Sequence, residues 1–194
     1  MKRLLEFAKK IKNKKLREKT VKLLKEPEIS NSDMIYPRAD FKKAPSWIGA
    51  HHDYEGGLLE HTLAVTEISV AIAKIFEKIY KTKVNMDYLI AGALLHDIMK
   101  VFILKKEAGT WSMTGSILDH GFFSGAELYA RGFPEEVIHI VSSHGGDLGQ
   151  AGANPRTLEA LIVFYADIID SAGESQIHGV ALEKQLQLLL MPQQ

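Results

Sequence analysis

Four histidines and two aspartates in this sequence have the side chains and the spacing of a metal-binding site. His96 and Asp97 are adjacent, and the other members follow one another at about the length of one helix and its connection. Neutral imidazoles and carboxylates suit divalent Mn, Fe, Co, Ni or Zn. The pattern therefore predicts that several helices bring six ligands to one or two metal ions: His61, His96, Asp97, His120, His144 and Asp167.

Helical periodicity accounts for the segments that carry these residues. Apolar side chains recur at steps of three or four, which is typical of a helix with one buried face. We expect helices over residues 58–79, 86–102, 119–131, 134–144 and 155–172, one or two amphipathic helices within 1–25, and a closing helix over 180–191. Proline and glycine interrupt residues 31–57, which we expect to be irregular, and residues 101–116 are expected to form a loop or a short strand pair.

Two of the candidate ligands are carboxylates on predicted buried faces. Asp97 shares a helix face with Leu94 and Val101, and Asp167 shares one with Val163. An ionised carboxylate is costly to bury unless a cation or a metal pairs with it. Neither aspartate has a Lys or Arg at helical spacing on its predicted face, so the sequence favours a metal as the partner of both.

The bulk composition fits one globular domain. The chain has 194 residues, of which 46% are hydrophobic and 25% are charged. It contains no cysteine, which excludes disulfides and thiolate metal sites and is compatible with the expected cytoplasmic location. No apolar run approaches the ~18–20 residues of a membrane span, so no membrane partner is expected.

The N-terminal segment is strongly basic although the net charge of the chain is zero. Residues 1–25 carry eleven Lys or Arg residues against two glutamates, Glu6 and Glu18. Such a segment either attracts a phosphate-rich partner or forms a solvated helix face. We expect residues 1–43 to be a basic helical segment with an irregular linker and residues 44–194 to be the main domain.

Three sequence blocks resemble the HD-domain superfamily of metal-dependent phosphohydrolases. They read GGLLEHTL (56–63), ALLHDIMK (93–100) and YADIIDS (165–171), and the resemblance covers residues 44–172. Within the superfamily, the chain is most similar to the HD module of 3′–5′ exoribonucleases, without their OB-fold. The family often has a glycine where Met99 stands, and many members have a second histidine where Gly145 follows His144. The resemblance implies an all-α helical bundle with the metal site in its core.

The resemblance also implies how the ligands are shared. His61, His96, Asp97 and Asp167 would bind a first metal ion, and His120 and His144 would bind a second, with Asp97 bridging the two. Such a dinuclear site clamps a phosphoryl group and activates a water molecule.

Other residues near these blocks are candidates for contact with a substrate. Lys100 would meet a phosphate oxygen, His51 and His52 would contact a phosphate, His52 would also protonate a leaving oxygen, and Arg156 would attract an anionic substrate. Asp170 would hold a ligand histidine rather than a metal. His139 and His178 have no assigned role, and each of the other residues could instead have no role in the site.

The favoured function is a metal-dependent phosphohydrolase or phosphodiesterase acting on a nucleotide, on RNA or on a cyclic phosphate. The same ligand pattern is similar to that of the di-iron oxygenases of the superfamily, which is one alternative. A non-catalytic metalloprotein whose basic segment binds nucleic acid is another. The sequence leaves open the metal, the substrate and the oligomeric state.

Overall fold

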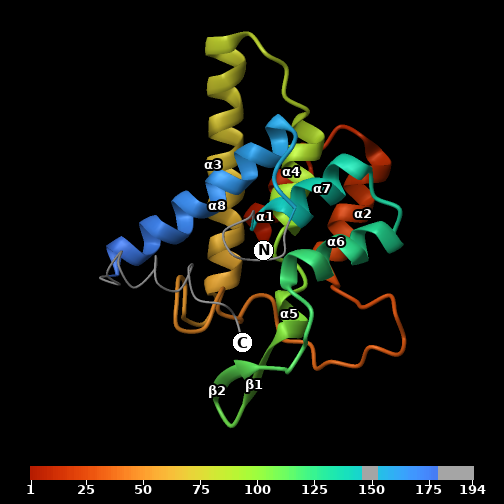
Figure 1. Cartoon of the computed structure of the whole chain (residues 1–194), viewed down its shortest axis with the longest axis vertical. Helices are drawn as coiled ribbons and strands as arrows, with labels where there is room; N and C mark the ends of the chain where they lie inside the picture. Colours follow the sequence, from red (N-terminus) through yellow and green to blue (C-terminus); the bar gives the residue numbers. More distant parts are fainter. Residues whose placement is uncertain (146–152, 179–194) are drawn as a thin grey trace.

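The computed structural model describes residues 1–145 and 153–178 and is helical almost throughout (Figure 1). The elements in chain order are α1 (Lys2–Ala8), α2 (Lys14–Lys25), α3 (Gly57–Tyr80), α4 (Met86–Leu95), α5 (Lys100–Ile103), β1 (Leu104–Glu107), β2 (Thr110–Met113), α6 (His120–Ala130), α7 (Glu135–Ser143) and α8 (Leu158–Ile177). The predicted all-α class is confirmed, since β1 and β2 form only an antiparallel hairpin. None of the described helices is both long and apolar enough to cross a membrane.

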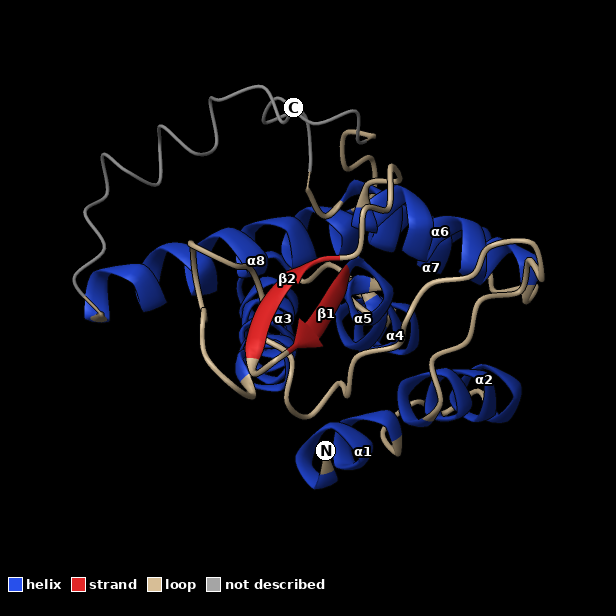
Figure 2. Cartoon of the chain, turned by 90° about the horizontal axis from the view of Figure 1, so that it is seen from below, coloured by secondary structure: helices blue, strands red, loops and turns tan. Residues whose placement is uncertain are grey.

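Helix α4 is the centre of the bundle. Its sequence from Leu89 to Leu95 contains no charged residue, and every side chain in that run is buried. Helices α3, α7 and α8 surround it, as do the two N-terminal helices (Figure 2). Gly92 allows α7 to approach closely, because a Cβ atom at this position would lie 2.4 Å from Cγ2 of Ile140. This contact brings the C-terminal ends of α4 and α7 together.

The predicted helix over 86–102 is wrong in its middle. Helix α4 ends at Leu95, residues 96–99 form turns, and a separate short helix, α5, begins at Lys100. Hydrogen bonds between residues three apart replace the α-helical pattern here, from Ile98 N to Leu95 O at 3.2 Å and from Lys100 N to Asp97 O at 3.0 Å. The tighter turns change the direction in which His96 and Asp97 point.

The N-terminal helices share the hydrophobic core of the bundle. Leu4 and Ala8 of α1 and Leu24 of α2 are fully buried in the same cluster as Leu94 of α4. The carboxylate of Asp87, in the first turn of α4, also accepts hydrogen bonds at 2.8 Å from the backbone of the turn between α1 and α2. The basic segment is therefore an integral part of the packed structure.

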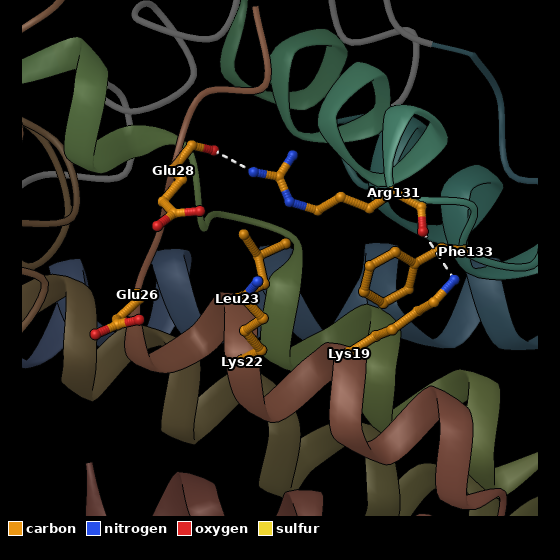
Figure 3. Close-up of a pocket in the computed structure, with 7 residues that line it drawn as sticks. All are labelled: Lys19, Lys22, Leu23, Glu26, Glu28, Arg131 and Phe133. Atoms are coloured by element: carbon orange, nitrogen blue, oxygen red, sulfur yellow. Dashed lines mark hydrogen bonds between the residues drawn. The ribbon is translucent and has the colours of Figure 1, made fainter.

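A polar contact ties α2 to the turn between α6 and α7 (Figure 3). Nζ of Lys19 donates to the carbonyl oxygens of Arg131 and Gly132 at 2.8 and 2.6 Å, and the guanidinium of Arg131 donates to the carbonyl oxygen of Glu28 at 2.7 Å. These groups line a pocket of about 220 Å³. Backbone carbonyls thus already engage the charged groups of Lys19 and Arg131.

The other predicted elements agree with the structure apart from their ends. Helix α3 follows the prediction for 58–79, α6 that for 119–131, α7 that for 134–144, and the hairpin lies within 101–116. Helix α8 begins and ends later than the predicted 155–172. The predicted helix over 180–191 and most of the loop before Pro155 lie outside the described residues.

Candidate metal centre

The six predicted ligands come from five places in the bundle and converge. His61 lies in the second turn of α3, His96 and Asp97 in the turn after α4, and Asp167 midway along α8. His120 is the first residue of α6, and His144 directly follows α7. The residues form two groups of potential ligands, and the ligand atoms of each group lie within 4.8 Å of one another: His61, His96 and Asp167, and Asp97, His120 and His144.

The carboxylate of Asp97 lies between the two groups. Its Oδ2 atom is 3.2 and 3.3 Å from Nε2 of His61 and His96, whereas its Oδ1 atom is 3.5 Å from Nε2 of both His120 and His144. Both oxygens are buried, and Oδ2 also lies 2.6 Å from Nζ of Lys100. Each oxygen thus faces its own pair of imidazole nitrogens, which is the geometry of a bridging ligand.

Backbone contacts orient two of these imidazoles. Nδ1 of His96 lies 2.8 Å from the carbonyl oxygen of Ala93, and Nδ1 of His144 lies 2.6 Å from that of Val141. A carbonyl accepts only from a protonated nitrogen, so the neutral rings present an Nε2 lone pair to the site. Facing Nε2 atoms are only 3.2 Å apart in one pair, His61 and His96, and 3.1 Å apart in the other, His120 and His144. Nitrogen atoms about 3 Å apart have the spacing of two neighbouring ligands of one ion at metal–nitrogen distances of about 2.0–2.1 Å, so the donor set fits divalent metal ions.

The charge of the centre is also consistent with metal ligands. Burial opposes ionisation of Asp97, but the charges of Lys100 and His96 outweigh it and hold its pKa well below the ordinary value. Burial likewise opposes ionisation of Asp167, but its hydrogen bond with His61 outweighs burial and holds its pKa far below the usual range. Both carboxylates are therefore ionised at neutral pH and available to a metal.

Asp170 holds His61 from behind. Its Oδ2 atom lies 2.7 Å from Nδ1 of His61 and 2.9 Å from Nε2 of His52, and Nδ1 of His52 lies 2.8 Å from the hydroxyl of Tyr54. Burial opposes ionisation of Asp170, but its hydrogen bonds with His52 and His61 lower its pKa to about 2. This is the contact expected of a carboxylate that orients a ligand histidine. His52, His61 and Asp170 also satisfy the spacing of a third metal group, but these hydrogen bonds already account for their proximity.

The close approach of the His52 backbone explains the glycine at position 57, the first residue of α3. His52 has a positive φ of 49°, which is unusual for a residue with a side chain. A Cβ atom at Gly57 would lie only 2.0 Å from the carbonyl oxygen of His52. Gly57 thus lets α3 start directly against the loop, which brings His52 close to His61.

Lys100 contradicts the expectation that Asp97 has no basic partner of its own. It follows Asp97 by three residues, is buried, and places Nζ 2.6 Å from Oδ2 of Asp97. The expectation was wrong because it overlooked Lys100, since residues three apart lie side by side on a regular helix as well. Lys100 thus offsets part of the charge of Asp97 while lying beside the centre.

The two remaining substrate candidates lie in different places. The ring of His51 is 4.9 Å from the ring of His61, and its Nε2 atom is 3.1 Å from the hydroxyl of Ser46. Arg156 is exposed, and its backbone nitrogen donates to Nε2 of His139 at 2.9 Å. The structure therefore places His51 at the centre and gives Arg156 a contact on α7 instead.

Two residues beside the site were not among the predicted ones. Asp119 caps α6, its carboxylate accepts from the backbone of Gly121 and Phe122, and its Oδ2 atom lies 3.3 Å from Nδ1 of His120. The ring of Trp47 lies 5.6 Å from that of His120. An aspartate just before a predicted helix is a typical N-cap and could have revealed Asp119, whereas no local pattern distinguishes Trp47.

Replacing Asp170 by asparagine should weaken metal binding at the His61 group about 10- to 100-fold, because the loss of a carboxylate behind a ligand histidine has effects of this size. Titration of the metal-free protein with Mn²⁺ against a competing chelator measures the change. Glu174→Gln, one helical turn later on α8, is the matched control and should bind as the wild type does. Equal affinity of the Asp170 variant and the wild type would contradict the proposed orienting contact.

Metal affinity should rise with pH across the neutral range. Burial opposes protonation of His61, but its hydrogen bonds with Asp167, Asp170 and Asp97 outweigh burial, and its pKa in the metal-free protein is well above 6.5. A metal must therefore displace a proton from His61, and the apparent affinity should increase up to about tenfold per pH unit until the pH exceeds that raised pKa. The same chelator competition between about pH 6.5 and 8.5 tests this, and an affinity independent of pH would refute it.

Known proteins resemble this chain over most of its length. A family model described as the HD domain matches residues 58–172. The dihydroneopterin 2',3'-cyclic phosphate phosphodiesterase of Methanocaldococcus jannaschii is 46% identical over 173 residues, which cover 88% of this chain and 69% of that protein. The 3'-5' exoribonuclease YhaM of Oceanobacillus iheyensis is 33% identical over 147 residues, or 69% of this chain and 43% of that protein, and YhaM of Bacillus subtilis is 29% identical over 143 residues. The chain thus spans less than half the length of these exoribonucleases. No solved structure matches it.

Proposed function

Because the chain belongs to the HD domain family, as the sequence blocks predicted, we propose that it is a metal-dependent phosphodiesterase acting on a 2',3'-cyclic phosphate of a small metabolite. The observation that carries the proposal is the position of Asp97, whose two oxygens face two separate pairs of histidines. Such a site suits a pair of ions that clamp one phosphoryl group.

The ligands fall into two sets in this proposal. His61, His96, Asp97 and Asp167 hold one ion, and His120 and His144 hold the other together with Asp97, the candidate metals being Mn, Fe, Co, Ni and Zn. The bound ions would lower the pKa of a water molecule and stabilise the negative charge that develops on the phosphoryl oxygens. In the reaction, water supplies one new P–O bond, one P–O ester bond breaks, and a proton ends on the released hydroxyl group.

Lys100 and His51 have the positions for contact with the phosphoryl group. Nζ of Lys100 is close to Asp97, and its charge would attract a phosphoryl oxygen at the centre. The pKa of His51 is well below its usual value because of burial and the charges of His61 and Lys100, so His51 is neutral and can donate one hydrogen bond. We assign the contact with the leaving oxygen to His51 rather than to His52, because Tyr54 and Asp170 engage both ring nitrogens of His52.

The relative that matches the larger share of the chain favours a small cyclic phosphate over RNA. The archaeal cyclic-phosphate phosphodiesterase aligns with 88% of the chain, whereas the exoribonuclease of Oceanobacillus iheyensis aligns with 69%. RNA is the second candidate, since a groove of about 550 Å³ is lined by basic residues of the N-terminal segment. Its lining residues are Lys9, Arg17, Glu18, Val21, Lys22, Lys25 and Glu26, and none of them belongs to the metal centre.

The test is an assay of the protein loaded in turn with Mn, Co, Ni, Zn, Mg or Fe(II). The substrates are dihydroneopterin cyclic phosphate, a nucleoside cyclic phosphate, bis-p-nitrophenyl phosphate and a short RNA. We expect ring opening of a cyclic phosphate with at least one metal and little release of nucleotides from RNA. His96→Ala should abolish the activity, with His139→Gln as the control outside the centre.

Three other outcomes would change the assignment. Absence of turnover with every metal would contradict a phosphodiesterase. Oxygen uptake by the iron-loaded protein that depends on an added organic substrate would favour the oxygenase alternative. RNA binding that depends on salt and persists in a His96→Ala, Asp97→Ala double variant would favour the nucleic-acid-binding alternative.

A further inference from the structure

We propose that the indole of Trp47 forms the surface on which a planar heteroaromatic ring of the substrate stacks. This inference rests on the proposed phosphodiesterase function and names the part of the substrate that the metal centre itself does not recognise. The pterin of a neopterin cyclic phosphate and the base of a nucleoside cyclic phosphate share this chemistry.

Trp47 lies beside two groups that would face the phosphoryl group. Its ring centroid is 5.6 Å from that of His120, with the two planes inclined by 51°, and Nζ of Lys100 is 5.3 Å from the centroid of the indole. Since His120 belongs to the second ligand set and Lys100 pairs with Asp97, Trp47 borders the centre. A ring that a short linker joins to the phosphoryl group would therefore come within reach of the indole.

The segment that carries Trp47 is fixed in place. Ser46 is fully buried and its backbone nitrogen donates to the carbonyl oxygen of His52 at 3.1 Å. The carbonyl oxygen of Trp47 accepts from the nitrogen of Ala50 at 3.3 Å, and that of Ala44 accepts from Leu58, the second residue of α3, at 3.0 Å. The loop is thus anchored on both sides of the tryptophan, and stacking on it costs little conformational entropy.

The indole remains partly accessible although its loop neighbours Pro45 and Ser46 are buried. A large aromatic ring that stays partly exposed at the edge of a polar site offers an apolar contact for a ligand. Replacing an aromatic side chain that stacks on a base by alanine lowers the affinity about 5- to 100-fold. The stacking energy depends little on which base it is. Trp47 therefore supplies affinity for a ring, while Lys100 and the ligand residues supply contacts to the phosphoryl group.

The test compares cyclic phosphates with and without an aromatic ring. The measured quantity is the ratio of kcat/KM for the aromatic substrate to kcat/KM for glycerol cyclic phosphate, which carries no ring. In Trp47→Ala this ratio should fall about 5- to 100-fold, mainly through KM for the aromatic substrate, and Trp47→Phe should recover most of it. Trp111→Ala is the matched control, because Trp111 is the other tryptophan of the chain, is also partly exposed, and lies on β2.

The outcomes separate this inference from the function on which it rests. If the wild type hydrolyses no cyclic phosphate at all, the proposed function fails. If it hydrolyses both kinds and the ratio is the same in Trp47→Ala and wild type, only the role of Trp47 fails. Pterin and nucleoside substrates are run as separate arms, and the arm with the larger fall in the ratio identifies the ring that Trp47 recognises.

Fluorescence gives a measurement that does not depend on turnover. In a Trp111→Phe variant, Trp47 is the sole tryptophan, and adenosine monophosphate should quench its emission in a saturable way. Glycerol phosphate at the same concentrations should leave the emission unchanged. Equal effects of the two ligands would overturn the stacking role.

Discussion

Asp97→Asn should reduce phosphodiester hydrolysis by at least about a thousandfold and should lower the number of tightly bound divalent ions per chain below two. Each oxygen of Asp97 faces one pair of histidines, so this carboxylate supplies an anionic ligand to both groups at once. Asparagine has nearly the same shape but no charge, and its amide group would turn a donor toward one pair. Loss of a single preorganised electrostatic group in an active site typically costs 10²- to 10³-fold, and Asp97 serves two.

The same substitution should also destabilise the metal-free protein. Lys100 is buried beside Asp97, and removal of one partner of a buried pair commonly costs about 3–5 kcal/mol because the other charge remains unpaired. The double variant Asp97→Asn, Lys100→Met removes both charges, so it should recover stability but not hydrolysis. This separates a loss of catalysis from a loss of folding.

The measurements are kcat/KM for a cyclic phosphate, metal content by mass spectrometry, and urea unfolding of the metal-free proteins. Asp33→Asn, at an exposed position, is the control and should match the wild type. A fully loaded and active Asp97→Asn protein would refute the bridging role.

Removal of metal should abolish hydrolysis and lower the thermal midpoint. An ion that binds the folded chain and not the unfolded one stabilises it by about 4 kcal/mol when its free concentration is a thousand times its Kd. In a chain of this size each 1 kcal/mol shifts Tm by about 2–4 °C, so one saturated site corresponds to a shift of roughly 10 °C. The buried histidines and aspartates explain why Tm should fall when the metal is removed, since a bound metal compensates for the solvation that these groups lose on folding.

One histidine midway along α7 and one directly after it give a matched pair for this experiment. His144→Ala should retain about one ion per chain and show a smaller shift of Tm on loading, because His144 lies in the second group of potential ligands with Asp97 and His120. His139→Gln should behave as the wild type, since the ring of His139 accepts from the backbone nitrogen of Arg156 and belongs to neither group of potential ligands. Scanning calorimetry with and without chelator measures both, and a Tm that does not change on removal of metal would contradict the assignment.

The ligand types and most of the helices could be predicted from the sequence. The apolar stripes that predicted α3, α6 and α7 are local patterns, and helix formation follows such patterns whenever one face is buried. The three blocks around His61, His96-Asp97 and Asp167 were sufficient to predict the HD domain family, which the family model then confirmed. The two N-terminal helices could also be predicted, although their charge concealed how much of them is buried in the core.

The arrangement of the site depended on contacts between residues far apart in the sequence. The break after Leu95 was missed because apolar periodicity continues through it. The contact of Lys100 with Asp97 is different, because an ideal helix also brings residues three apart together, so this pair could have been predicted from the sequence.

The sequence by itself therefore determined which side chains are of metal-binding type and which helices they lie on or directly follow, because residue type and periodicity are local properties. Only the tertiary structure decided which histidine pair faces which oxygen of Asp97, that Asp170 holds His61, and that Trp47 borders the centre. These relations depend on how closely helices approach one another. For example, the absence of a side chain at Gly92 lets Ile140 of α7 pack directly against α4. Side chains on many elements determine such distances jointly, so no single segment of the sequence specifies them.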